Sequence, residues 1–81
     1  MKSIEYVNQK MMEALDEYEA AVALVDSDPE SHARVAVALM RLCDYSELYG
    51  FGEMPLSIMI RYHGVVINEM KKEFEEELEI I

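Results

Sequence analysis

The sequence has no tryptophan, one cysteine, two prolines and three glycines, and only seven of its 81 residues are lysine or arginine. A single cysteine, Cys43, cannot form a disulfide within the chain, so we expect a reducing, cytoplasmic setting. The scarcity of basic residues argues against direct binding of nucleic acid, because affinity for phosphate comes from clustered lysine and arginine.

Long apolar runs are also missing. The longest extend over residues 20–25 and 35–40, whereas about 20 apolar residues are needed to cross a bilayer. The first ten residues include a glutamate and two amides where a signal peptide would need an apolar segment. We therefore expect no contact with a membrane and no secretion by this route.

Residues that bind metals or act as nucleophiles are few and widely spaced. His32, Cys43 and His63 match none of the usual zinc or di-iron spacings. Cys43 is followed by Asp44, whose negative charge disfavours the reactive thiolate. The chain also lacks a glycine-rich phosphate loop. The sequence therefore predicts no catalytic residue, no metal and no cofactor, and hence a protein that is not an enzyme.

What the sequence does contain is acidic and apolar side chains. Its 17 acidic and seven basic residues give a net charge of -10, and 52% of the chain is hydrophobic, which is too much for intrinsic disorder. This length allows one domain, residues 1–81. A domain of this size buries only about 60–65% of the surface of its unfolded chain. A partner chain is therefore expected.

The apolar pattern predicts three helices. Residues 4–25 repeat apolar side chains at alternating steps of three and four, which indicates one long amphipathic helix. Asp28 is a suitable N-cap, and Pro29 a suitable first residue, for a second helix over residues 29–49. That segment is apolar on nearly every side, so we interpret it as the central helix. We expect it to be covered by a homodimer interface that includes Val35, Leu39, Leu42 and Cys43.

The third segment allows two structures. A hairpin across residues 56–67 competes with a helix whose stripe runs through Met59, His63, Val66, Met70 and Phe74. We favour the helix, because residues 68–79 are strong helix formers that continue this stripe without a break. The predicted fold is thus an all-α three-helix bundle, and we expect a homodimer in which a second chain covers the middle helix. A glycine inside the third helix, Gly64, would then allow another backbone to approach closely.

Charge is divided between the two ends of the chain. Residues 1–30 hold eight acids and two bases, residues 53–81 hold seven acids and three bases, and the middle is neutral. In a bundle, the outer helices would surround a neutral centre with negative potential.

The leading functional hypothesis is a non-enzymatic inhibitor or DNA mimic that occupies a basic surface of a partner protein. Small acidic inhibitors of phages and mobile elements are similar in size and charge. The carboxylates expected to bind are on the first and third predicted helices: Glu13, Asp16, Glu17, Glu19, Glu73, Glu76 and Glu77.

The alternative is a small structural or regulatory subunit. It would pack an apolar, methionine-rich face into a homo- or hetero-oligomer, and its carboxylates would only keep it in solution. Tyr49, Phe51 and Met54 are candidates for an adaptable apolar patch, with Met54 expected to be exposed.

Overall fold

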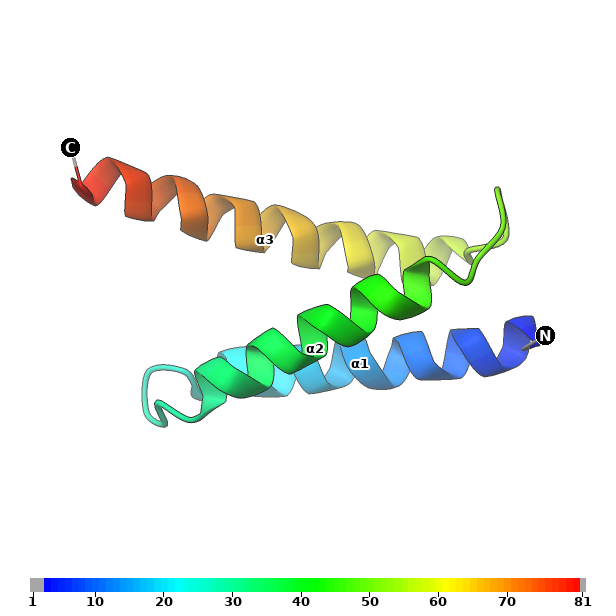
Figure 1. Ribbon diagram of the computed structural model, residues 1–81, viewed down its shortest axis with the longest axis horizontal. Coiled ribbons are helices and arrows are strands. Elements are labelled where there is room, and N and C mark those ends of the chain that lie inside the picture. The colour runs from blue at the N-terminus through cyan, green and yellow to red at the C-terminus, as the bar shows by residue number, and fades with distance from the viewer. Residues whose placement is uncertain (1–2, 81) are drawn as a thin grey trace.

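The computed structural model describes residues 3–80, which form three α-helices and no strand. These are α1 (Ile4–Leu24), α2 (Ser31–Ser46) and α3 (Leu56–Ile80) (Figure 1). The predicted all-α, three-helix fold is confirmed for this part of the chain, and the alternative of a hairpin over residues 56–67 is wrong. Figure 1 shows α1 and α2 as an antiparallel hairpin along which α3 lies.

Helix α1 begins and ends close to where the sequence pattern places it. Ser3 is the N-cap, and its hydroxyl accepts a hydrogen bond from the Tyr6 amide at 3.2 Å. The side chains that repeat at steps of three and four are buried on one face. These are Val7, Met11, Ala14, Leu15, Tyr18 and Ala21.

Helix α2 is shorter than the pattern indicates. It starts at Ser31, because residues 29 and 30 form a turn in which the Asp28 carboxylate accepts the Glu30 amide at 3.1 Å. It ends at Ser46, whose hydroxyl donates to the Cys43 carbonyl at 2.8 Å, and residues 47–49 form the following turn and bend.

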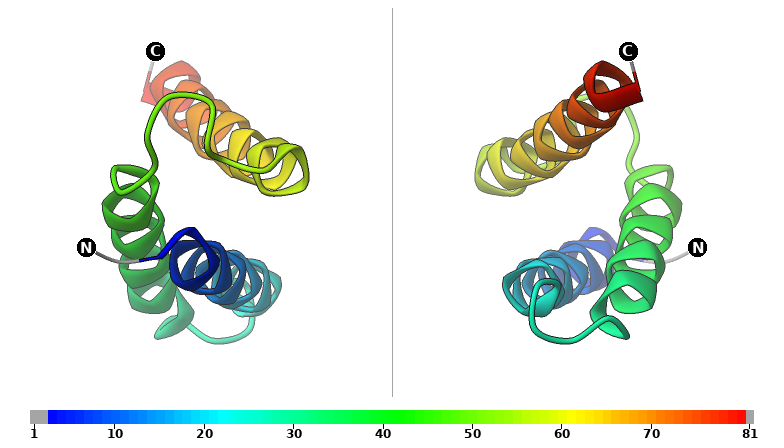
Figure 2. Two further views of the ribbon diagram at one scale, coloured as in Figure 1. Left: turned by 90° about the vertical axis from the view of Figure 1, so that its right-hand side faces the viewer. Right: turned by 90° about the vertical axis from the view of Figure 1, so that its left-hand side faces the viewer.

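The central helix is α1, not α2. Only one face of α2 is buried, through Ser31, Val35, Ala38 and Leu42. Helix α1 packs against α2 along its length and also against α3, whereas α2 and α3 have little direct contact. The end-on views of Figure 2 show the three helices around a common centre. The expectation of a buried central α2 was wrong because its alanines cover little area and the rest of its surface faces outward.

Helix α3 is continuous over 25 residues. Ile58 and Val65 are its buried side chains, and Tyr62 packs beside them against the core. Figure 1 shows the C-terminal half of α3 diverging from the hairpin, and Figure 2 shows it crossing from the side of α1 toward that of α2. Helix α3 therefore forms one long edge of the molecule, and mainly its first half holds it to the hairpin of α1 and α2.

Gly64 lies in this helix with open space around it. A Cβ atom added there would meet no atom of the described chain within 4 Å, apart from the neighbouring helical backbone. Gly52 differs, because its φ of 76° is a conformation that favours glycine. Packing within the chain therefore does not require a glycine at position 64.

We expect Gly64→Ala to raise the free energy of unfolding by about 0.5–1 kcal/mol, because alanine has the higher helix propensity and no atom obstructs its methyl group. Gly52→Ala is the matched control and should lower it by about 1 kcal/mol. Urea unfolding followed by circular dichroism measures both. A loss of stability in Gly64→Ala would mean that space at this position is needed.

Candidate functional site

Arg61 of α3 forms an ionic clasp with α1. Its guanidinium lies 2.8 Å from an Asp16 carboxylate oxygen and 3.1 Å from one of Glu19. Hydrogen bonding to Asp16 and Glu19 raises the pKa of Arg61 above its ordinary value. Two carboxylates expected to bind a partner are thus engaged within the chain, where they attach α3.

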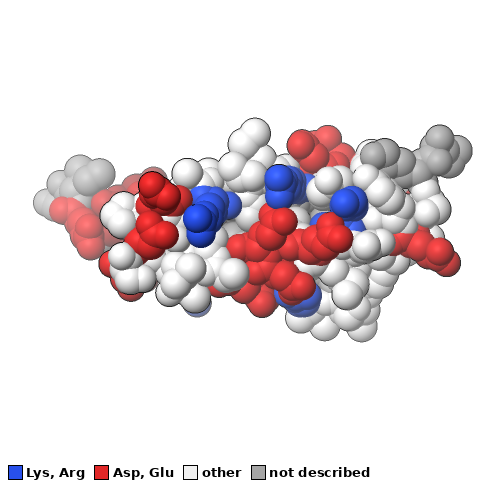
Figure 3. Space-filling view, turned by 90° about the horizontal axis from the view of Figure 1, so that it is seen from below, with Lys and Arg blue, Asp and Glu red and all other residues white. Residues whose placement is uncertain are grey.

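The other acidic residues predicted on α1 are paired as well. Arg41 of α2 donates to Glu17 at 2.6 Å, and Lys10 lies 3.3 Å from Glu13. Figure 3 views the molecule from below Figure 1. It shows carboxylates gathered in the middle of that face, with lysine and arginine side chains around them. The predicted acidic surface of α1 is therefore partly neutralised by basic residues of the same chain.

The acidic residues of α3 form a separate group at the C-terminal end of the molecule. Glu73, Glu76 and Glu77 are exposed, and no ion pair found within residues 3–80 includes them. Glu73 and Glu76 border a cleft of about 410 Å³ between α3 and the hairpin, whereas Glu77 borders a shallow hollow that contains Phe74. The seven predicted carboxylates therefore do not form one continuous binding face.

A polar cluster joins α1 to the middle of α3. The Tyr18 hydroxyl donates to Glu69 at 3.2 Å and accepts a hydrogen bond from the Asn68 amide at 2.8 Å. Burial raises the pKa of Tyr18, and the hydrogen bond from Asn68 opposes this effect. A similar contact ties α1 to the end of the hairpin, where the Tyr49 hydroxyl donates to Asn8 at 2.6 Å. Burial also raises the pKa of Tyr49.

The polar side chains of Arg41, Tyr62 and His63 do not converge on one site between the helices. Arg41 is engaged by Glu17, the Tyr62 hydroxyl lies 3.4 Å from that of Ser46, and His63 is exposed on α3. Among residues 3–80 there is no group of three histidine, cysteine, aspartate or glutamate side chains placed to hold a metal. None of the helices in this range is both long and apolar enough to cross a bilayer.

The predicted apolar patch of Tyr49, Phe51 and Met54 is divided by the fold. Phe51 is fully exposed, but Tyr49 and Met54 are half-buried and pack against the core. The expectation that Met54 is exposed was wrong, because this side chain of the connection between α2 and α3 packs against the core.

The predicted dimer interface on α2 is also divided. Val35 and Leu42 are buried in the core of the single chain, and Leu39 is half-buried against it. Of the four side chains, only Cys43 is exposed. These residues therefore do not form an open surface that a second chain could cover, and a dimer would need another face.

Sequence reasoning missed an exposed apolar surface on the face of α3 that points away from α1. We call it the outer stripe: Leu56, Ile60, His63, Ile67, Met70, Phe74 and Leu78. Its six apolar members are 54% to 70% exposed, and its successive residues are three or four positions apart, which places them on one side of a helix. The signal was present in the sequence, but the apolar residues of this helix were assigned to the core.

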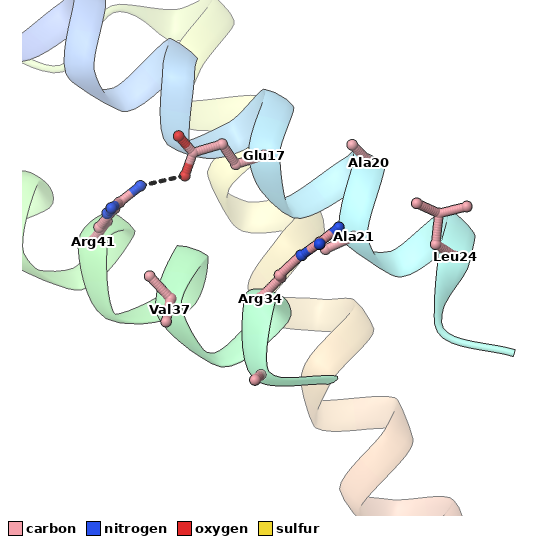
Figure 4. A pocket seen from close by; sticks show the side chains of 8 residues that line it. Glu17, Ala20, Ala21, Leu24, Arg34, Val37 and Arg41 are labelled. Carbon is pink, nitrogen blue, oxygen red and sulfur yellow. Dashed lines mark hydrogen bonds and ion pairs between the residues drawn. The ribbon is translucent and has the colours of Figure 1, made fainter. Parts of the chain in front are cut away.

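A second apolar hollow lies on the hairpin. It is a groove of about 410 Å³ between α1 and α2, with Ala21 and Leu24 on one side and Val37 on the other. Arg34 and Arg41 border it, and Figure 4 shows Arg41 directed to Glu17. This groove could accommodate an apolar group with an anionic end, but it is shorter than the outer stripe.

No protein-family model, curated protein or solved structure matches the chain. The surfaces of the molecule are therefore the basis for assigning its function.

The ionic clasp predicts a stability effect. Arg61→Met should lower the free energy of unfolding by about 0.5–1 kcal/mol, a small value because both carboxylates are exposed to water. Arg34→Met, at an exposed arginine of α2, should change it by less than about 0.5 kcal/mol. Urea unfolding at low and high salt compares the two variants. Equal effects would show that the clasp does not help to hold α3.

The buried tyrosines predict a loss of stability in alkali. Because folding raises the pKa of Tyr18 and Tyr49, their contribution is fully present below the ordinary tyrosine pKa of about 10 and is lost as the pH rises through their folded values. Unfolding free energies measured between pH 8 and 11 should therefore fall with pH. The double variant Tyr18→Phe, Tyr49→Phe should show a shallower fall, and an unchanged slope would contradict this assignment.

Proposed function

We propose that the protein is a small, non-enzymatic interaction subunit that binds another protein chain through the outer stripe of α3. The observation that carries this proposal is the exposure of six large apolar side chains in one line on a helix whose opposite side is packed. Contiguous apolar patches of this kind on a small protein mark interaction surfaces, because leaving them in water is unfavourable.

The size of the stripe supports this function. From Leu56 to Leu78 it spans 22 helical steps, or about 33 Å, and a helix is about 10 Å wide. The projected area is therefore about 330 Å², within the roughly 300–600 Å² of the largest apolar patch on a typical monomer, a patch that is often functional. Burial of apolar area stabilises by about 25 cal/mol per Å², so covering the stripe could contribute several kcal/mol before the costs of association.

The second candidate is the binding of a basic partner surface by the end of α3. It is favoured by the acidic group at positions 73–79, which is exposed and for which no ion pair is found within residues 3–80. The paired carboxylates of α1 support it less, because a partner would have to displace Arg41 or Arg61. An acidic inhibitor or DNA mimic would therefore act through α3 alone.

The two candidates predict opposite outcomes for two sets of variants. Ile67→Asp with Phe74→Asp should reduce the recovery of partner proteins from native-host cells at least tenfold, because a charge must then be buried at the interface. Met40→Asp, at an equally exposed apolar position on α2, is the matched control and should leave recovery unchanged. The measurement is affinity purification of the tagged full chain with quantitative mass spectrometry.

The acidic candidate is tested in the same experiment by replacing Glu73, Glu76 and Glu77 with glutamine. Under the leading proposal this variant retains its partners. If it loses them while the aspartate variants of the stripe keep theirs, the interaction is electrostatic and the leading proposal is wrong. Such binding would also weaken steeply as salt is raised.

A further inference from the structure

The spacing of the outer stripe suits a second helix of the same kind. Its residues follow one another at steps of four, three, four, three, four and four, close to the seam of a two-helix coiled coil. The stripe runs from the first residue of α3 to near its C-terminal end, and among its members only His63 is not apolar. A partner that covers all of it must therefore present an apolar line of about the same length.

The opposite face of α3 is already used by its own chain. Ile58 and Val65 are buried there, Tyr62 packs against the core, and Arg61 and Asn68 contact α1. These residues lie about half a turn from the stripe. The helix can therefore bind a second chain without giving up any contact that holds it to the hairpin.

Charge along α3 indicates how two copies would be oriented. Residues 56–64 contain one arginine and no acid, whereas residues 69–79 contain six glutamates and two lysines. Two parallel copies would place their acidic halves side by side, and like charges in that arrangement repel. Two antiparallel copies place the acidic half of each helix along residues 56–64 of the other, which carry no acid, so the like charges lie farther apart.

We propose that the outer stripe binds the outer stripe of a second copy of this chain, with the two α3 helices antiparallel. This inference rests on the proposed function, because it assigns the occupant of the same surface. The interface is isologous, as in most homodimers. With the two-fold axis at the midpoint of the stripe, Ile67 meets its own copy, Ile60 lies opposite Phe74, and Leu56 lies opposite Leu78. The two hairpins lie on the outside of the dimer.

The limited length of the interface sets the expected affinity. The projected area is about 330 Å² per chain, or roughly 660 Å² for the pair, which is below the roughly 1,200–2,000 Å² of a stable interface, so we expect a weak dimer with a dissociation constant in the micromolar range or above. At the concentrations of a dilute assay the chain is then mostly monomeric, and it associates when concentrated.

Sedimentation equilibrium of the purified full chain tests the association. Between micromolar and millimolar concentrations the wild type should shift from monomer to dimer. Ile67→Asp with Phe74→Asp should raise the dissociation constant at least a hundredfold. Met40→Asp should leave it within about twofold of the wild type. Circular dichroism verifies that each variant remains helical. A wild type that stays monomeric throughout, or equal weakening by Met40→Asp, overturns the proposal.

Disulfide cross-linking tests the orientation in a Cys43→Ser background, which removes the one native thiol. Ile60→Cys and Phe74→Cys are prepared as separate proteins and oxidised alone and as a mixture. The antiparallel dimer gives a cross-link in the mixture and little in either protein alone. Cross-links in each protein alone indicate a parallel pair and overturn the proposed orientation.

A third cysteine variant detects the competing site on the hairpin. If Phe74→Cys instead cross-links to Val37→Cys, α3 of one copy occupies the groove between α1 and α2 of the other, and the proposal is wrong.

Failure of self-association is distinguishable from failure of the proposed function. A strictly monomeric chain that still loses host partners through Ile67→Asp and Phe74→Asp would retain the function with a different occupant.

Discussion

The structure depends on the apolar face of α1. Met11 and Leu15 are completely buried on this face, and Tyr18 is nearly so. The face packs against α2 along the hairpin and also receives the first half of α3. Because one helix supplies the core for both of its neighbours, each neighbour can bury only part of its own circumference. This leaves apolar side chains of α2 and α3 in water, and it explains why a small, acidic chain has so much exposed apolar surface.

Ion pairs and polar hydrogen bonds help to attach α3 to α1, and this uses carboxylates that would otherwise be available to a partner. Arg61 joins α3 to Asp16 and Glu19, and the Tyr18 hydroxyl joins α1 to Asn68 and Glu69. Each exposed ion pair contributes little to stability. Together with the half-buried hydrogen bonds they select which side of α3 faces the hairpin. Some of the carboxylates that the sequence suggests as a binding surface therefore connect helices within the chain. Within residues 3–80, five glutamates for which no ion pair is found lie close together at positions 73–79 of α3.

The sequence predicted α1 better than it predicted α2 or the connection to α3, and the reasons are physical. The limits of α1 were well predicted, because a regular apolar stripe is a local feature that the helix itself satisfies. Helix α2 was placed too centrally, because its apolar segment looks buried on all sides although only Val35, Ala38 and Leu42 of its apolar side chains are buried. The half-buried state of Tyr49 and Met54 had no local signal, since it depends on their packing against a core formed by distant residues. A homodimer remains a prediction, now assigned to a different helix.

The sequence by itself determined three helices, the separation of charge toward the two ends of the chain, and a length too small for a deep core. These properties follow from periodicity, helix propensity and composition, which act over a few residues or over the whole chain. Only the tertiary structure decided which of the apolar faces of α3 is covered and which carboxylates are free. Both faces of this helix have helical spacing, and their patterns are equivalent until α1 meets one of them. That contact buries Ile58 and Val65, engages Arg61, and leaves the outer stripe exposed.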